Sequence, residues 1–349
     1  MNPESYDVRP PRLCLDPLSG RPVFVAPQRA AKPNDATLAA GLAVDSAWVD
    51  AWCPFCAGNE DRTPPDLARF PAGSSAAWRA RIVPNHYPIT IGGTAVTPPP
   101  VPAGRPACGF HEVVIESPRH DRSILAIDPS DWQEVWELCR HRLAELAADE
   151  SLAWATVFKN SGPRAGASLE HVHSQLVAID IVPPAIAVEV TGCRGGDPFG
   201  DLIADARSAG RVVAESGGLV ALVPPAPRQP FETWIMTRLP ERHFHDTSRE
   251  RVMALADLTR DMVGRLDRVA PGCDFNWWLH QAPFLRTATD TELTGAWHWH
   301  LEMLPRLAEL AGFELGTGCH ITTVSAEESA RRLQEAGIRP CRSTSYPSS

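Results

Sequence analysis

Apolar side chains recur at helical spacing in two long segments of the chain. This periodicity predicts one helix over residues 129–148, with Asp128 as its N-cap, and a second over Arg249–Val269. Shorter runs rich in β-formers predict strands before and after each helix. Around the first helix these runs are Glu112–Glu116, Ala153–Lys159 and His171–Asp180, and around the second they are Glu232–Thr237, Phe275–His280 and Trp297–Leu304.

The two groups of elements follow the same order along the chain. A strand, a helix and two further strands occur twice, and 127 residues separate His171 from His298 at matching points of the two copies. We therefore predict an α+β fold built by duplication, with antiparallel sheet and flanking helices on one face. The predicted domains are residues 1–185, beginning with an arm that holds a strand at Pro22–Ala26, and residues 186–349.

Composition narrows the class of protein. The 349 residues are 44% hydrophobic, which is enough for a buried core, and the net charge of -9 argues against a protein that binds nucleic acid through its phosphates. The two lysines, Lys32 and Lys159, stand outside any Gly-Lys-Ser/Thr context, which excludes a P-loop. No apolar run has the length of a membrane span or a signal peptide, and nine scattered cysteines indicate a reducing, cytoplasmic setting.

Cys53-Pro54-Phe55-Cys56 places two thiolates on one tight turn. A structural zinc ion takes four such ligands, so two more are needed. Downstream, His111, His120 and His171 offer candidates. Taken alone, the motif is equally compatible with a redox pair or with two packed cysteines.

The segment His171-Val172-His173-Ser174-Gln175 is the most specific chemical signal in the chain. In a strand, alternate residues share a face, so His171, His173 and Gln175 line one side. A solvent-facing strand would give the same pattern. Here, however, the strand follows a loop over residues 160–168 whose glycines and amides suit phosphate oxygens, and an imidazole beside such a loop can attack phosphorus.

Several motifs together resemble galactose-1-phosphate uridylyltransferase and its relatives, a branch of the histidine triad superfamily. They are the Cys-Pro-Phe-Cys turn, Ser117-Pro118-Arg119-His120, Asn160 and the His171–Gln175 segment, with Asp16–Gly20, Arg29–Pro33, His298–Glu302 and Ala311–Glu314 continuing the likeness to both ends. The motifs occur in the family's order along nearly the whole chain. The resemblance implies a duplicated histidine-triad-like fold and a homodimer.

The resemblance also implies roles for the matching residues. His173 matches the nucleophile, which would attack the α-phosphorus of a nucleoside diphosphate sugar and form a nucleotidyl-histidine. Cys53, Cys56, His120 and His171 match the ligands of a structural zinc ion. That ion would hold the strand that carries the nucleophile.

Other matching positions surround the reacting phosphate. Gln175 stands where many hydrolytic relatives have a third histidine, and its neutral amide can donate to a phosphoryl oxygen without protonating a leaving group, which suits transfer. Ser168 and Asn160 match family positions that touch the phosphates and the nucleotide, and Gly162 lies in the same loop. Asn85 resembles another nucleotide contact. Each of these residues could instead be a turn residue.

Arg29 and Lys32 match basic positions that reach substrate phosphates, partly across a dimer interface. Two solvated surface charges are the alternative interpretation. A phosphate ligand nevertheless needs some cation, and the chain has few lysines.

A second metal site is suggested by Glu189, His280, His298 and His300. His298 and His300 share a strand face, and Glu189 follows Gln175 at the spacing of the family's metal-binding glutamate. The nitrogen and oxygen donors suit zinc or iron. The alternative is an inert copy of the His-x-His stripe packed by tryptophans, namely Trp277, Trp278, Trp297 and Trp299.

The carboxy-terminal block differs from the galactose-specific form. Residues 311–320 resemble the branch of ADP-glucose phosphorylases and bacterial relatives, while Glu314 is kept and could accept from sugar hydroxyls. That branch also has a Cys-x-x-Cys after the catalytic strand, where this chain has Cys193 and Gly196.

These observations lead to one preferred function and two rivals. We expect a nucleotidyltransferase that moves a nucleoside monophosphate from a nucleotide sugar to a sugar 1-phosphate. The first rival is a phosphorylase with inorganic phosphate as acceptor. The second is a zinc-stabilised nucleotide-binding protein without activity, against which the retention of both His173 and Gln175 argues.

Overall fold

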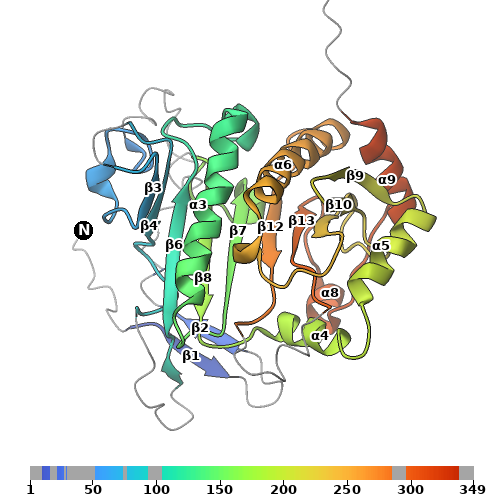
Figure 1. Ribbon diagram of the computed structural model, residues 1–349, viewed down its shortest axis with the longest axis horizontal. Coiled ribbons are helices and arrows are strands. Elements are labelled where there is room, and N and C mark those ends of the chain that lie inside the picture. The colour runs from blue at the N-terminus through green and yellow to red at the C-terminus, as the bar shows by residue number, and fades with distance from the viewer. Residues whose placement is uncertain are drawn as a thin grey trace, which may run out of the picture.

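The computed structural model describes residues 10–15, 22–26, 29, 52–73, 77–92, 104–284 and 296–337. Lys32, one of the predicted phosphate contacts, lies outside these residues. A sheet of ten strands runs through the molecule, and a small three-stranded sheet lies at its lower edge (Figure 1).

The large sheet is antiparallel throughout and has the order β3-β4-β6-β8-β7-β12-β13-β11-β10-β9. Its strands, in chain order, are β3 (Ala68–Phe70), β4 (Ala80–Pro84), β6 (Gly109–Ile115), β7 (Trp154–Ser161), β8 (His173–Ile179), β9 (Val212–Ser216), β10 (Leu219–Leu222), β11 (Thr233–Thr237), β12 (Phe275–His280) and β13 (His300–Pro305). The small sheet pairs β1 (Arg12–Leu15) with β2 (Pro22–Val25) and β5 (Arg105–Pro106).

The order of the strands shows the duplication directly. From the centre outward, one half reads β7-β8-β6-β4-β3 and the other reads β12-β13-β11-β10-β9. The halves meet where β7 pairs with β12, so one continuous sheet carries both copies. His173 begins β8 and His300 begins β13, which places the two His-x-His motifs at matching points, as predicted.

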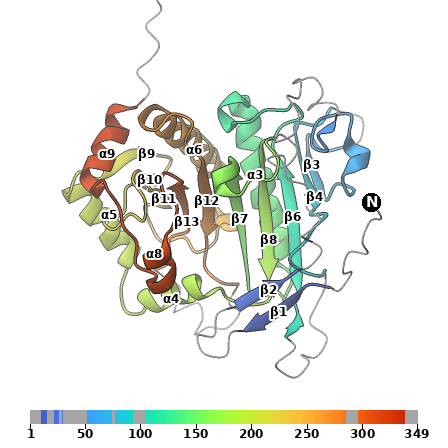
Figure 2. The same cartoon turned by 180° about the vertical axis from the view of Figure 1, so that it is seen from behind.

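One helix of each copy covers the same face of the sheet (Figures 1 and 2). These are α3 (Pro129–Ala147), capped by the Asp128 side chain, and α6 (Arg249–Val269), capped by Ser248. Trp132 and Trp136 of α3 pack against Trp277 of the sheet, and α9 (Ala326–Glu335) extends the same core. The two long helices predicted from apolar periodicity are confirmed.

The strand predictions are also confirmed, with shifts of a few residues at their ends. The largest shift concerns the two His-x-His segments, whose strands begin at the second histidine of each motif. Short 3-10 helices precede the long helices in both copies: η3 (Ile124–Ala126) and η5 (Phe244–Asp246).

The prediction that the helices lie on one face is wrong for the second half. Here α4 (Pro184–Gly192) and α5 (Pro198–Ser208) pack on the opposite face. The reason is that Val220 and Leu222 of β10 turn away from α6 and are covered by Phe199 and Ile203 of α5. A further short helix, α8 (Gly312–Thr317), lies beside α4 in Figure 1.

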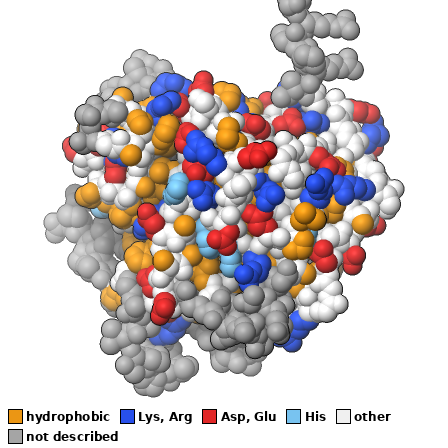
Figure 3. Space-filling model, in the orientation of Figure 1, with side chains coloured by type: hydrophobic (Ala, Val, Ile, Leu, Met, Phe, Trp, Pro, Cys, Tyr) orange, Lys and Arg blue, Asp and Glu red, His pale blue; other side chains and the backbone are white. Residues whose placement is uncertain are grey.

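Charged side chains of both signs lie on the surface. On the face shown in Figure 3, basic and acidic side chains are interspersed. In the part of the chain that is described, no helix combines the length and apolar character that crossing a bilayer requires.

Candidate active site

Two cysteines and two histidines from distant parts of the chain converge beside β8. Cys53 and Cys56 come from the Cys-Pro-Phe-Cys turn, His120 follows β6, and His171 immediately precedes β8. Cys53, Cys56 and His171 are buried. Of the three histidines considered as partners of the cysteines, the structure brings in His120 and His171, whereas His111 lies elsewhere.

The distances within this cluster suit a tetrahedral zinc ion. The Nδ1 atom of His171 lies 3.5 Å from Cys53 Sγ and 3.6 Å from Cys56 Sγ, and His120 Nδ1 lies 3.5 Å from Cys56 Sγ. Zinc bonds of about 2.3 Å to sulfur and 2.0–2.1 Å to nitrogen, at a tetrahedral angle, separate those donors by about 3.6 Å. These three separations match a tetrahedral zinc site, and all four donor atoms lie within 4.8 Å of one another.

His171 is held in the protonation state that a metal ligand needs. Its Nε2 lies 2.9 Å from the Ser117 carbonyl oxygen, which only accepts, so Nε2 carries the hydrogen and Nδ1 offers its lone pair to the cluster. Burial lowers the pKa of His171 to about 4, which keeps the ring neutral at physiological pH.

His173 has a fixed ring orientation as well. Its Nδ1 donates to the carbonyl oxygen of His171 at 2.7 Å, which leaves the lone pair on Nε2. The ring of Phe55, from the Cys-Pro-Phe-Cys turn, packs against it with a centroid distance of 5.3 Å. The turn that supplies two cysteines of the cluster thus also supports the predicted nucleophile.

Gln175 lies on the same face of β8 and is buried. Its Oε1 is 2.9 Å from Nε2 of His111, a residue of β6 that the sequence offered only as a possible metal ligand. The register pairs Val113 with Gln175, so His111 is the diagonal neighbour of Gln175 across the strands.

The loop after β7 contains the predicted phosphate contacts. Asn160 accepts a hydrogen bond from the side-chain amide of Asn276 at 2.8 Å. Gly162 has a φ of 86°, and a Cβ there would lie 1.9 Å from an Asp274 carboxylate oxygen, so only glycine fits. Ser168 lies half-buried in the bend before His171.

A hollow of about 380 Å³ opens on the sheet face opposite α3 and α6. It spans the junction of β7 and β12 and is lined mainly by aromatic and amide side chains. Its lining includes Trp154, Thr156, Phe158, Asn160, Asn276, Trp278 and His280. This hollow reaches from the predicted nucleotide contact Asn160 to His280, a predicted ligand of the second metal site.

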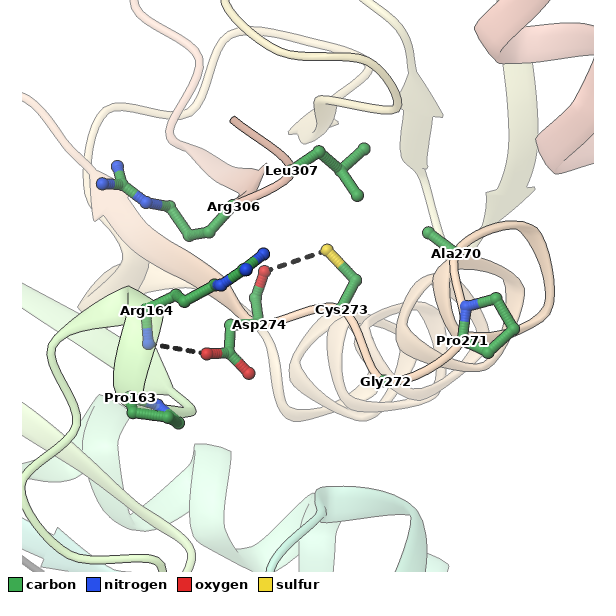
Figure 4. Close-up of a pocket in the computed structure, with 9 residues that line it drawn as sticks. All are labelled: Pro163, Arg164, Ala270, Pro271, Gly272, Cys273, Asp274, Arg306 and Leu307. Atoms are coloured by element: carbon green, nitrogen blue, oxygen red, sulfur yellow. Dashed lines mark hydrogen bonds between the residues drawn. The ribbon is translucent and has the colours of Figure 1, made fainter. Parts of the chain in front are cut away.

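A second cleft, of about 340 Å³, lies beside Pro163 and Arg164 of the loop that follows β7 (Figure 4). Arg164, Asp274 and Arg306 line it, and the Arg164 backbone N–H donates to the Asp274 carboxylate at 2.7 Å. It contains none of the residues predicted from the sequence to bind or react with substrate.

The remaining predicted substrate contacts divide between the two halves. Arg29 donates to the Tyr87 carbonyl oxygen at 2.7 Å, and Asn85 Oδ1 accepts the Tyr87 N–H at 2.8 Å, so both join one segment next to His111. Burial lowers the pKa of Arg29. Glu314 instead lies on the helix α8, in the second copy of the fold, where it accepts the Ala311 N–H.

A second group of potential metal ligands forms at the matching point of the other copy. Ligand atoms of Glu189, His280, His300 and Glu302 lie within 4.8 Å of one another. Three of these were predicted from the sequence. The fourth predicted residue, His298, is not in the group, because its Nε2 lies 3.2 Å from Asp197 Oδ1.

Glu302 was missed, although it follows His300 by two residues on the same strand face. Burial raises the pKa of Glu302, but His300, His280 and Arg228 outweigh that effect and hold it at about 2. An ionised carboxylate beside two imidazoles and Glu189 fits a zinc or iron ion by its donor types.

A third cluster does not have the geometry of a metal site. Ligand atoms of His243, His245 and Asp246 lie close together, but the two imidazole rings stack with centroids 4.8 Å apart and planes at 17°. A bound metal lies in the plane of each imidazole that ligates it, and planes so nearly parallel do not meet beside both rings. The pair packs against Phe284.

Comparisons with known sequences place this geometry in context. Residues 122–339 match a family model described as "Domain of unknown function (DUF4921)". The chain is 32% identical to an ADP-glucose phosphorylase of Arabidopsis thaliana over 343 residues, which cover 96% of this chain and 95% of that protein. It is 26% identical to a galactose-1-phosphate uridylyltransferase of Thermotoga maritima over 247 residues, covering 66% and 75% of the two chains.

Solved structures show the same relationship. An ADP-glucose phosphorylase from Arabidopsis thaliana, determined with bound ADP-glucose, superposes with a TM-score of 0.72 at 30% identity and covers 95% of this chain and all of that one. A uridylyltransferase structure superposes with a TM-score of 0.74 at 24% identity, covering 93% and 98%, and shares the fold.

Proposed function

Since this chain belongs to the family of galactose-1-phosphate uridylyltransferases and ADP-glucose phosphorylases, we propose that it transfers a nucleoside monophosphate from a nucleoside diphosphate sugar, with His173 as the covalent nucleophile. One observation carries the proposal. The hydrogen bond from His173 Nδ1 to the His171 carbonyl oxygen leaves the lone pair on Nε2, on a strand adjoining the Cys/His cluster.

The first half-reaction forms one bond and breaks one. The Nε2 lone pair attacks the α-phosphorus, the bond from that phosphorus to the bridging oxygen breaks, and sugar 1-phosphate leaves with the electron pair. The Gln175 amide would donate to a phosphoryl oxygen as negative charge develops there. In the second half-reaction, an oxygen of a phosphorylated acceptor attacks the phosphorus and the P–N bond breaks, which returns the electron pair to Nε2.

The two predicted metal sites have supporting roles in this proposal. Zinc at Cys53, Cys56, His120 and His171 would hold His171 in place. The backbone carbonyl oxygen of His171, which accepts the hydrogen bond from His173 Nδ1, would then be fixed as well. A second zinc or iron ion at Glu189, His280 and His300 would join α4 to β12 and β13. Neither ion takes part in a bond-forming step.

Covalent labelling tests the proposal. Incubation with α-labelled ADP-glucose and UDP-glucose should place acid-labile label on His173, and the His173→Asn variant should stay unlabelled while it keeps its fold. Wild-type protein that stays unlabelled with a broad panel of nucleotide sugars would falsify the proposed function.

The acceptor distinguishes two candidate activities. The sequence alone favoured a sugar 1-phosphate, but the similarity to an ADP-glucose phosphorylase over 96% of the chain favours inorganic phosphate as the second candidate. Isolated labelled enzyme should be offered each acceptor separately. Release of label by phosphate alone, as a nucleoside diphosphate, assigns a phosphorylase; release by sugar 1-phosphate alone assigns a transferase.

The substrate contacts and the oligomeric state belong to the same proposal. Arg29, Asn85, Asn160, Gly162 and Ser168 would surround the nucleotide and its phosphates. Glu314 on α8 would accept from sugar hydroxyls, and the protein would form a homodimer, as the resemblance to the family implies. Sedimentation velocity tests the dimer.

A further inference from the structure

Asn276 of β12 lies directly opposite Asn160 of β7, where the two copies of the fold join. Both side chains are half-buried and line the hollow on the sheet face opposite α3 and α6. Asn160 is a predicted nucleotide contact, whereas Asn276 stands in no motif and has no role in the proposed mechanism. Its hydrogen bonds nevertheless join the half of the sheet that carries His173 to the second copy.

Asn160 lies in the same row of the sheet as the predicted nucleophile. The register of β7 and β8 pairs Phe158 with Gln175, and two residues further along each strand Asn160 comes opposite His173. Residues that lie opposite each other in an antiparallel pair have their side chains on the same face. Asn276, Asn160 and His173 therefore form one row across three adjacent strands, which lie about 4.8 Å apart.

A backbone carbonyl decides which way the Asn276 amide faces. The Nδ2 atom of Asn276 lies 2.8 Å from the Ala165 carbonyl oxygen, and a carbonyl oxygen can only accept. If the amide were turned over, two oxygens would face each other at that distance. The NH2 group of Asn276 therefore faces Ala165, and one of its two hydrogens is used there.

The same NH2 group decides the orientation of Asn160. Asn160 Oδ1 lies 2.8 Å from Asn276 Nδ2 and accepts its second hydrogen. With Asn160 turned over, two NH2 groups would meet, and two donors form no hydrogen bond. The oxygen of Asn160 is thus bound and its NH2 group is left to donate. Among the described residues, no other hydrogen bond of either side chain favours a different orientation.

The loop that follows Asn160 is attached to the same end of β12. The Asp274 carboxylate accepts the Arg164 N–H at 2.7 Å. Together with the bond from Asn276 to the Ala165 carbonyl oxygen, two side chains of the second copy hold the predicted phosphate-binding loop. Asn160 is therefore oriented at the start of a loop whose position is itself fixed.

We propose that Asn276 is a positioning residue, which turns the Asn160 amide so that its NH2 group is presented to the phosphoryl group attacked by His173. This inference rests on the proposed function, because it concerns the formation of nucleotidyl-His173. It assigns Asn276 an effect on the chemical step through Asn160, with no contact of its own with the phosphoryl group.

Asn276→Asp tests this orientation directly. A carboxylate accepts but does not donate, so Asn160 would turn its NH2 group toward position 276 and present its oxygen to the phosphoryl group. In single-turnover labelling with α-labelled ADP-glucose and UDP-glucose, we expect the maximal rate of nucleotidyl-His173 formation to fall by about 10²-fold. The half-saturating substrate concentration should change less, because the negative charge on the phosphoryl oxygens develops during the attack.

Two further variants separate orientation from loss of a hydrogen bond. Asn276→Ala frees the Asn160 amide without introducing a charge and should lower the rate by less than Asn276→Asp does. Gln334→Glu is the matched control, because this amide of α9 also donates to backbone carbonyl oxygens, those of Gly210 and Val212, at the far edge of the sheet. It should leave the labelling rate unchanged, and an equal loss of rate in Gln334→Glu and Asn276→Asp overturns the positioning role.

A double-mutant comparison shows whether Asn276 acts through Asn160. In an Asn160→Ala background, Asn276→Asp should add little further loss of rate, because no amide remains to be oriented. Thermal denaturation checks the fold of each variant. A folded Asn276→Asp variant with the wild-type rate, or additive losses in the double variant, overturns the positioning role while labelled wild type upholds the proposed function; unlabelled wild type overturns both.

Discussion

Lys159 forms a buried ion pair with Glu116 directly behind the predicted nucleophile. The Lys159 ammonium lies 2.6 Å from Glu116 Oε2 and donates to the His173 carbonyl oxygen at 2.8 Å. The Ser174 hydroxyl donates to the other Glu116 oxygen at 2.5 Å. Both charged side chains are almost fully buried, on the sheet face covered by α3 and α6. The pair therefore fixes the backbone of β8 at the residue that bears the nucleophile.

Removing one partner of this pair should be costly. We expect Lys159→Met to lower the free energy of unfolding by about 3–5 kcal/mol, because it leaves the Glu116 carboxylate buried without its counter-charge. The double variant Lys159→Met/Glu116→Leu should regain a large part of that loss. Urea denaturation of wild type, Lys159→Met and the double variant measures both effects, and equal stability of the single and double variants would contradict the buried-pair explanation.

The Cys/His cluster should hold one zinc ion per chain. Replacing one of the four ligands, by Cys56→Ser or by His120→Asn, should remove that zinc ion. The melting temperature should then fall, because the free energy of zinc binding stabilises the fold. Metal content by mass spectrometry of the purified protein measures occupancy. Cys319→Ser removes an exposed cysteine and should leave the zinc content unchanged; wild-type protein that folds without zinc would speak against the site.

His245 should make the fold sensitive to acid. Burial, followed by the neighbouring His243, lowers the pKa of His245 from 6.5 to about 4. Above pH 6.5 the ring is neutral in both states. As pH falls from 6.5 to 4, the unfolded chain binds a proton that the folded chain excludes, so stability is lost across that window, by up to about 3 kcal/mol.

The His245→Asn variant should lose correspondingly less stability between pH 7.5 and pH 4. Urea denaturation at both pH values measures the difference, and His141→Asn, which changes an exposed imidazole, serves as the control. The same pH dependence in wild type and His245→Asn would show that this ring is not the group responsible.

Much of the fold could be predicted because local patterns and tertiary structure agree. The helices at residues 129–147 and 249–269 follow their apolar periodicity, and the duplication places His173 and His300 at equivalent strand starts. The position of α5 could not be predicted in this way. The apolar side of α5 indicates that this helix packs against the sheet. Which face of the sheet it packs on is decided by β10, because Val220 and Leu222 of that strand face away from α6.

The candidate site was predictable where one motif contains the chemistry. Cys53, Cys56, His171 and His173 stand in short motifs, and the resemblance of these motifs to the uridylyltransferase family, rather than spacing alone, implied which of the side chains come together. His111 has no such motif, and its contact with Gln175 depends on the register of two strands 64 residues apart. Glu302 was within reach, because period-two alternation from His300 puts its side chain on the same face.

The second ligand group should hold an ion whose loss affects stability more than catalysis. His280→Asn removes a ligand from the Glu189, His280, His300 and Glu302 group, and we expect it to lose one metal equivalent while the Cys/His zinc stays bound. The reason for the effect on stability is that two carboxylates, Glu189 and Glu302, would remain close together without the ion. Metal content, melting temperature and the rate of His173 labelling, measured on the same preparation, separate the possibilities. A folded variant with wild-type stability that has lost nucleotidyl transfer would show that this ion acts in the chemistry, which would overturn its structural role.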